Sequence, residues 1–94
     1  MPMGMRALHA QKPETLRAKL VRLADAFGAA KGLSRGTVSD RVFGAGHVLG
    51  GMAAGTRDCS TGTYEKALQW FSDNWPDDVS WPSGIDRPSR NEAA

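Results

Sequence analysis

Residues 24–43 read ADAFGAAKGLSRGTVSDRVF, and this stretch decides the fold predicted for the chain. The alanine-rich sequence up to Lys31 favours a helix, and Gly32 stands where that helix must stop. A glycine there can adopt the left-handed conformation that closes a helix. Ser34 is a good N-cap, because its hydroxyl can accept a hydrogen bond from a free amide of the next helix. The stretch therefore predicts a helix, a sharp turn at Gly32 and a second helix that starts near Ser34.

The second helix has two unlike faces. Val38 and Val42 are four residues apart, so they share one face, which we expect to be buried. The opposite face is expected to carry Arg35, Gly36, Ser39 and Asp40. Two helices that cross steeply over a short glycine turn form a helix-turn-helix unit, whose second helix can enter the major groove of DNA.

Residues 32–42, GLSRGTVSDRV, resemble the turn and recognition helix of the lactose-repressor family. The matching positions are Gly32, Leu33, Ser34, Thr37, Val38, Ser39 and Val42. The likeness is confined to residues 24–43, and nothing downstream resembles the sugar-binding domain of a repressor. The resemblance implies a DNA-binding helix-turn-helix.

The resemblance also implies roles for individual residues. It places Arg35, Gly36 and Asp40 against bases, and Thr37 and Ser39 near phosphates. The sequence departs from the family at Asp40, where a basic residue is usual. It departs again at Arg41, where an aliphatic residue usually packs.

The candidate DNA-binding residues come from the turn, the second helix and a later loop. They are Lys31, Ser34, Arg35, Gly36, Thr37, Ser39, Asp40 and Arg57. Arg35 is expected to read sequence, since arginine can bond bidentately to guanine. Lys31, Thr37 and Arg57 are expected to hold phosphates and set the register. A module of this size reads few base pairs, so we expect a homodimer on a palindromic site.

The charge distribution indicates that the half of the chain that carries the motif is the half that contacts DNA. The net charge is +2. Residues 1–57 carry nine Lys/Arg against three acids, or +6, whereas residues 58–94 carry three against seven, or −4. A cationic half that also holds the motif is the pattern expected if this side meets phosphates. The alternative is a solvated helix surface whose charges are mostly basic.

Other segments also show helical spacing. Pro13 can occupy the first turn of a helix that runs to Lys31. Its apolar stripe consists of Leu16, Leu20, Leu23 and Phe27. Gly28 weakens this helix and marks either a kink or a close approach of the next helix. The glycine-rich residues 44–55 predict either a short helix from about His47 to Ala54 or a compact loop.

The strongest amphipathic segment runs from Ser60 or Thr61 to about Asn74. One of its faces consists of Tyr64, Ala67, Leu68, Phe71 and Trp75. Pro76 ends the helix, because the residue before a proline is pushed out of the helical region. Residues 70–82, WFSDNWPDDVSWP, also resemble small uncharacterised proteins of proteobacterial genomes and prophages, a likeness that implies no activity.

The sequence thus predicts an all-α protein, a compact bundle of three to four short helices that contains a helix-turn-helix. An extended strap rich in Trp and Pro is expected to follow the last helix. Residues 1–11 are predicted to be a flexible arm, 12–82 a single helical domain and 83–94 a disordered tail. The apolar runs are too short to span a bilayer, and one cysteine fits a reducing compartment, so we expect a cytoplasmic protein.

The expected function is that of a small sequence-specific DNA-binding protein, a transcriptional regulator of phage or mobile-element origin. We expect no enzyme, metal or cofactor, because His47 lacks a second ligand and Cys59 lacks a neighbouring histidine in sequence. The alternative is a protein-binding module on the same scaffold, an antiactivator or a phage-encoded inhibitor of a host protein. Asp40 and the acidic Trp75–Trp81 strap favour that alternative.

Overall fold

The structure is a computed structural model that describes residues 13–91. Within this range it contains four helices and no strand, so the predicted all-α class is confirmed. The helices are α2 (Leu16–Lys31), α3 (Arg35–Phe43), α4 (Val48–Ala54) and α5 (Thr61–Asn74). None of these helices is long and apolar enough to cross a membrane. The arm predicted for residues 1–11 and the last three residues of the predicted tail lie outside the described range.

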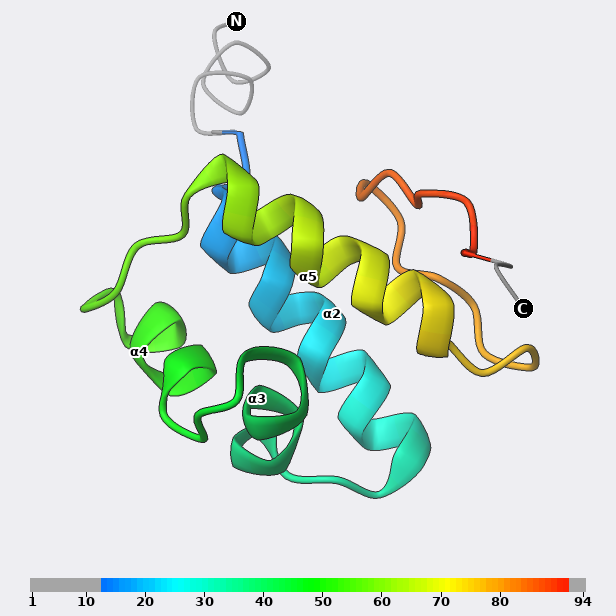
Figure 1. Ribbon diagram of the computed structural model, residues 1–94, viewed down its shortest axis with the longest axis horizontal. Helices are drawn as coiled ribbons and strands as arrows, with labels where there is room; N and C mark the ends of the chain where they lie inside the picture. Colours follow the sequence, from blue (N-terminus) through cyan, green and yellow to red (C-terminus); the bar gives the residue numbers. More distant parts are fainter. Residues whose placement is uncertain (1–12, 92–94) are drawn as a thin grey trace, which may run out of the picture.

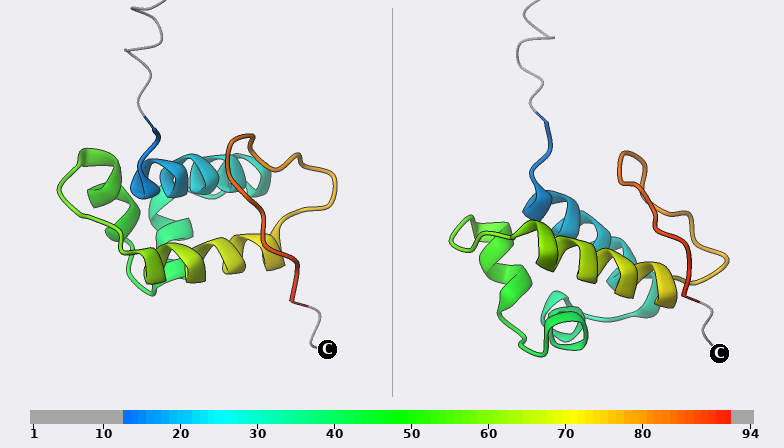
Figure 2. Two further views of the ribbon diagram at one scale, coloured as in Figure 1. Left: turned by 90° about the horizontal axis from the view of Figure 1, so that it is seen from above. Right: turned by 45° about the horizontal axis from the view of Figure 1, so that its top comes forward.

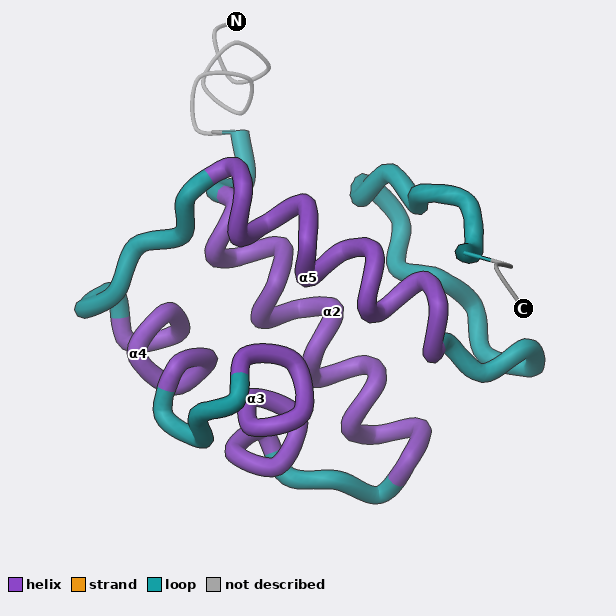
Figure 3. Tube along the Cα trace, in the orientation of Figure 1, coloured by secondary structure: helices purple, strands orange, loops and turns teal. Residues whose placement is uncertain are grey.

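The helices form a compact arrangement around α2 and α5. These two lie side by side and run in the same general direction, and α3 packs against both (Figures 1 and 2). Figure 1 shows α3 nearly end-on, so its axis is steeply inclined to that of α2. α4 packs against α2 and α3, and the chain after α5 lies at the opposite end of the molecule (Figure 3).

Side-chain caps explain where three of the helices begin. Thr15, Ser34 and Ser60 each accept a hydrogen bond from the amide three residues later, at 3.1, 3.2 and 3.1 Å respectively. The starts predicted for α3 and α5 are therefore confirmed. The expectation that Pro13 lies in the first turn of α2 is wrong, because the hydroxyl of Thr15 caps the helix instead.

All four helices contribute to one hydrophobic core. The buried apolar residues are Leu20, Leu23, Ala24, Phe27, Val38, Val48, Leu49, Met52, Ala67, Leu68, Phe71, Trp75 and Ile85. They include most of the apolar stripes predicted for α2 and α5. α4 buries Val48, Leu49 and Met52 on one side, so residues 44–55 adopt the helical alternative rather than a compact loop. Burial of this face offsets the low helix propensity of the glycines.

Aromatic rings fill the core between α2 and α5. The ring centroid of Phe27 lies 5.4 Å from that of Trp70 and 5.7 Å from that of Phe71, both edge-to-face. Trp75 is 2% exposed, and its ring lies 4.9 Å from that of Trp81. Edge-to-face contacts are favourable because the positive edge of one ring meets the negative face of another. The cluster joins α2, α5 and the chain after α5 in one core.

The chain after α5 packs back against the helices. The disordered tail predicted from Ser83 onward is therefore wrong for residues 83–91. Ile85 is 5% exposed, and its carbonyl accepts a hydrogen bond from Trp81 Nε1 at 2.7 Å. Trp75 Nε1 donates to the carbonyl of Val79 at 2.9 Å, so both indole N–H groups are satisfied within the segment.

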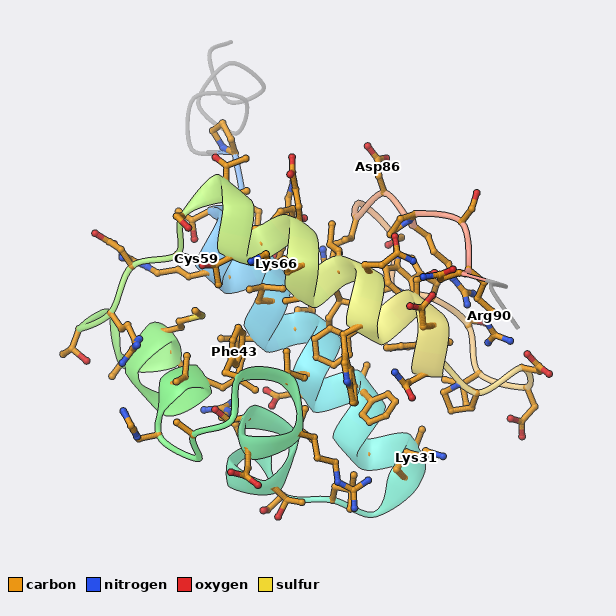
Figure 4. All side chains as sticks on the ribbon, viewed as in Figure 1. Lys31, Phe43, Cys59, Lys66, Asp86 and Arg90 are labelled. Atoms are coloured by element: carbon orange, nitrogen blue, oxygen red, sulfur yellow. The ribbon has the colours of Figure 1, made fainter. Side chains whose placement is uncertain are left out.

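Two arginines fix this segment to the end of α5. The last carbonyls of a helix lack intrahelical partners, and the proline after Trp75 cannot continue the helix. Arg87 Nη2 and Arg90 Nε donate to the carbonyl of Ser72 at 3.0 and 3.1 Å, and Arg90 Nη2 donates to that of Trp75. Arg90 lies beside the end of α5 (Figure 4). Positive charge at this end also complements the helix dipole. Hydrogen bonds to α5 thus hold a segment whose polar composition suggested disorder.

Candidate nucleic-acid interface

The turn at residues 32–34 sets the position of α3 against α2. Gly32 is left-handed, with φ 71° and ψ 34°, and its N–H and that of Leu33 both donate to the carbonyl of Gly28. A Cβ at Gly28 would lie 2.6 Å from the carbonyl oxygen of Leu33 and 3.5 Å from Val38 Cγ2. Gly28 therefore permits a close approach of the turn and α3, which is one of the two roles predicted for it.

Two hydroxyl groups are paired at the start of α3. Ser34 Oγ accepts the N–H of Thr37 at 3.2 Å and donates to Thr37 Oγ1 at 3.0 Å. Both residues are exposed. The N-cap role predicted for Ser34 is confirmed, and the hydroxyl hydrogen of Thr37 is left for an outside acceptor such as a phosphate oxygen.

Most of the predicted site residues are exposed. They are Lys31, Ser34, Arg35, Gly36, Thr37, Asp40 and Arg57. Lys31 lies at the end of α2 beside the turn (Figure 4). Gly36 is partly covered by the α3–α4 loop, since a Cβ on it would lie 3.6 Å from the carbonyl oxygen of Gly46. Arg57 lies in the loop after α4, where its N–H donates to Gly51, and the structure does not bring it against α3. The exposed surface built around α3 therefore consists of the exposed residues within 31–41.

Arg35 forms a two-bond ion pair with Asp25 of α2. Its Nε donates to Oδ1 at 3.1 Å and its Nη2 to Oδ2 at 2.7 Å. The side chains of Arg35 and Asp25 are 42% and 46% exposed, so water screens their attraction. The hydrogen bonds to Asp25 raise the pKa of the Arg35 guanidinium. Sequence reasoning missed Asp25, because only the crossing of α2 and α3 brings these two residues together.

Ser39 is not on the exposed face, and its predicted place near phosphates is wrong. The residue is fully buried. Its hydroxyl donates to the carbonyl of Ala45 at 2.6 Å and accepts the N–H of Leu49 at 3.1 Å. The N-cap of α4, His47, makes no side-chain cap bond, so Ser39 satisfies an amide of the first turn of α4 from a different helix. Its position on the helix faces α4, a neighbour that the sequence pattern did not reveal.

Replacing Ser39 by alanine is expected to lower the free energy of unfolding by about 1–2 kcal/mol. The change leaves the N–H of Leu49 buried without its partner, whereas the half-buried carbonyl of Ala45 can regain water. Urea unfolding followed by far-UV circular dichroism measures this. Ser80→Ala is the matched control, because Ser80 is exposed and should change stability by no more than about 0.5 kcal/mol. Equal stabilities of Ser39→Ala and Ser80→Ala would contradict the cap role.

The charges on the outer surface of α3 are mixed. Among the described residues, the ion pairs include neither Lys31 nor Arg41, and both side chains are exposed. Asp40 is also exposed, and within residues 13–91 it forms no ion pair. Lys31 and Arg41 are thus available to an anionic partner, while Asp40 opposes one. Arg41, named above only as a departure from the family, belongs to the exposed surface because α3 turns it away from the core.

Metal-ligating and nucleophilic side chains also occur in the range 13–91, outside the surface around α3. No cluster of three or more His, Cys, Asp or Glu side chains that could hold a metal ion occurs among these residues. Cys59 is half-buried, and burial raises the pKa of its thiol, which disfavours the nucleophilic thiolate. Its Sγ lies 3.5 Å from the carbonyl oxygen of Ser60.

Comparison of the chain with protein-family models, curated protein sequences and solved structures finds no match.

Proposed function

We propose that this protein binds double-stranded DNA in a sequence-specific manner and presents α3 to the major groove. The proposal is supported by the way α3 packs against the rest of the protein. This helix crosses α2 steeply over the turn at 32–34, buries Val38 against the core and exposes Arg35, Thr37 and Arg41. A helix exposed in this way can enter the major groove, which admits one helix and carries the base-specific donors and acceptors.

The surrounding charges support a role for the phosphate backbone. Lys31 and Arg41 are exposed and outside the ion pairs of the described residues, and Thr37 offers a hydroxyl hydrogen. Such groups fix the register of a protein on the duplex without reading its sequence. Asp40 must then lie over a base, where a carboxylate can accept from the amino group of cytosine. The small number of contacts available to one α3 favours binding as a homodimer to two half-sites.

Replacing Lys31 by alanine is expected to weaken binding to all duplexes alike and to reduce the salt dependence of binding. The slope of log affinity against log salt falls by about 0.9 for every phosphate that the protein ceases to neutralise. A gel-shift titration of sheared genomic DNA at several salt concentrations measures the slope. Lys19→Ala is the matched control, because Lys19 lies in the first turn of α2, where it lines a groove with Tyr64 and Asp86, whereas Lys31 ends α2 at the turn.

One result would count against DNA binding, and another against the surface around α3 as the part that contacts DNA. If the parent protein retards no fragment at low salt, the proposal is wrong. If Lys19→Ala and Lys31→Ala reduce the slope equally, a diffuse positive charge and not the surface around α3 meets the phosphates.

A groove beside α3 favours a second candidate, a protein-binding module. Val42 and Phe43 of α3 and Ala67 and Trp70 of α5 line this groove of about 270 Å³. A helix with apolar anchors fits such a groove. The Trp75–Trp81 strap is a poorer docking site, because Trp75 is buried in the core. Docking through apolar anchors depends little on salt, so a partner retained at high salt would favour this candidate over DNA.

A further inference from the structure

The ion pair between Arg35 and Asp25 leaves one edge of the guanidinium group available. An arginine has five N–H donors arranged as a planar fork. Asp25 takes the edge formed by Nε and Nη2, at 3.1 and 2.7 Å. No hydrogen bond of the described residues involves Nη1, and the side chain is 42% exposed. The edge formed by Nη1 and Nη2 therefore retains two parallel N–H groups, the pattern that matches O6 and N7 of guanine.

We propose that Asp25 is a positioning residue that holds Arg35 so that its Nη1–Nη2 edge meets a guanine in the major groove. The proposal rests on the DNA-binding function inferred above. A long side chain loses rotamer freedom when it binds, and the two bonds to Asp25 fix the plane of the guanidinium before the duplex arrives. The carboxylate of Asp25 also repels phosphates, so it opposes contact of Arg35 with the DNA backbone. Asp25 thus favours base recognition by Arg35 over binding that ignores sequence.

The substitution Asp25→Asn distinguishes the positioning of Arg35 from the effect of the negative charge of Asp25. Asparagine keeps the shape of the side chain, but it turns one acceptor into an NH₂ group that faces the N–H groups of Arg35. A bidentate arginine discriminates guanine from a wrong base by about 5- to 150-fold. Asp25→Asn is expected to remove most of that discrimination. Affinity for unrelated duplex is expected to stay equal or to rise, because a negative charge is removed.

The test starts from duplexes enriched from a randomised library by the parent protein, used as the full chain. Each guanine of an enriched duplex is replaced in turn by 7-deazaguanine, which lacks the N7 acceptor. Dissociation constants are measured for the parent, Asp25→Asn, Arg35→Ala and the double variant. Asp58→Asn is the matched control, because its carboxylate pairs with Arg17 at 2.6 Å in another part of the molecule. Thermal melts by circular dichroism confirm that each variant is folded, as expected for changes at exposed ion pairs.

At one position, replacement of guanine by 7-deazaguanine should weaken the binding of the parent and of Asp58→Asn. The same replacement should leave the binding of Asp25→Asn and of Arg35→Ala unchanged. The double variant should behave as Arg35→Ala alone. The proposal is overturned if Asp25→Asn discriminates as the parent does. Tighter binding by Asp25→Asn with unchanged discrimination would instead mean that Asp25 blocks Arg35. If the parent binds DNA but no guanine responds, only this inference fails, whereas a parent that binds no duplex removes the proposed function as well.

Discussion

Replacing Trp75 by alanine is expected to lower the free energy of unfolding by about 3–5 kcal/mol. The indole is 2% exposed and contacts Phe27, Phe71 and Trp81, so its removal leaves a cavity that these rings cannot fill. Small domains have a total stability of about 5–15 kcal/mol, so this loss is a large part of the whole. Urea unfolding followed by far-UV circular dichroism measures the change.

Trp75→Phe is the matched variant for this test. Phenylalanine keeps an aromatic ring in the cluster but cannot donate the hydrogen bond that Trp75 Nε1 makes to Val79 at 2.9 Å. We expect Trp75→Phe to cost clearly less than Trp75→Ala, because most of the packing is retained. A loss below about 1 kcal/mol for Trp75→Ala would show that the chain after α5 contributes little to the core.

Replacing Gly28 by alanine is expected to destabilise the protein by about 2–3 kcal/mol, although alanine is the better helix former. Helix propensity alone predicts a gain of about 1 kcal/mol at this position. The new Cβ would lie 2.6 Å from the carbonyl oxygen of Leu33, a backbone atom fixed by the turn. Relief of that clash must move α3 away from α2, so loss of the proposed DNA binding is expected together with loss of stability.

Gly50→Ala provides a control of opposite sign. Gly50 lies within α4, is exposed, and has no atom within 4 Å of an added Cβ. The same chemical change there is expected to stabilise the protein by about 0.5–1 kcal/mol. Thermal melts of the two variants give the comparison directly. If Gly28→Ala also stabilises the protein, then α2 and α3 do not approach each other as closely as the structure has them.

The features that the sequence predicted well are those that depend on near neighbours in the chain. Ser34 and Ser60 cap α3 and α5 as expected, because a cap bond joins residues three apart. The apolar stripes of α2 and α5 follow from helical spacing alone. Gly32 ends α2 in the left-handed conformation that its position indicated.

Two errors concern residues whose partners lie on a different element of the fold. Ser39 has the polarity of a surface residue, yet it is buried because α4 returns to place Leu49 and Ala45 against its hydroxyl. Residues 83–91 have the composition of a disordered tail, yet Arg87 and Arg90 satisfy the last carbonyls of α5. Such bonds cannot be predicted from the spacing of residues, because the two partners of a hydrogen bond need not recur at a regular interval in the sequence.

The sequence by itself determined the all-α class, the N-caps of α3 and α5 and the turn between α2 and α3, since propensities and capping act over a few residues. Tertiary structure alone decided which polar side chains of α3 remain accessible and that Asp25 holds Arg35. The crossing of α2 and α3 and the return of α4 set these contacts. They arise from packing between different helices, where burial and hydrogen bonding override the surface preference of a single residue.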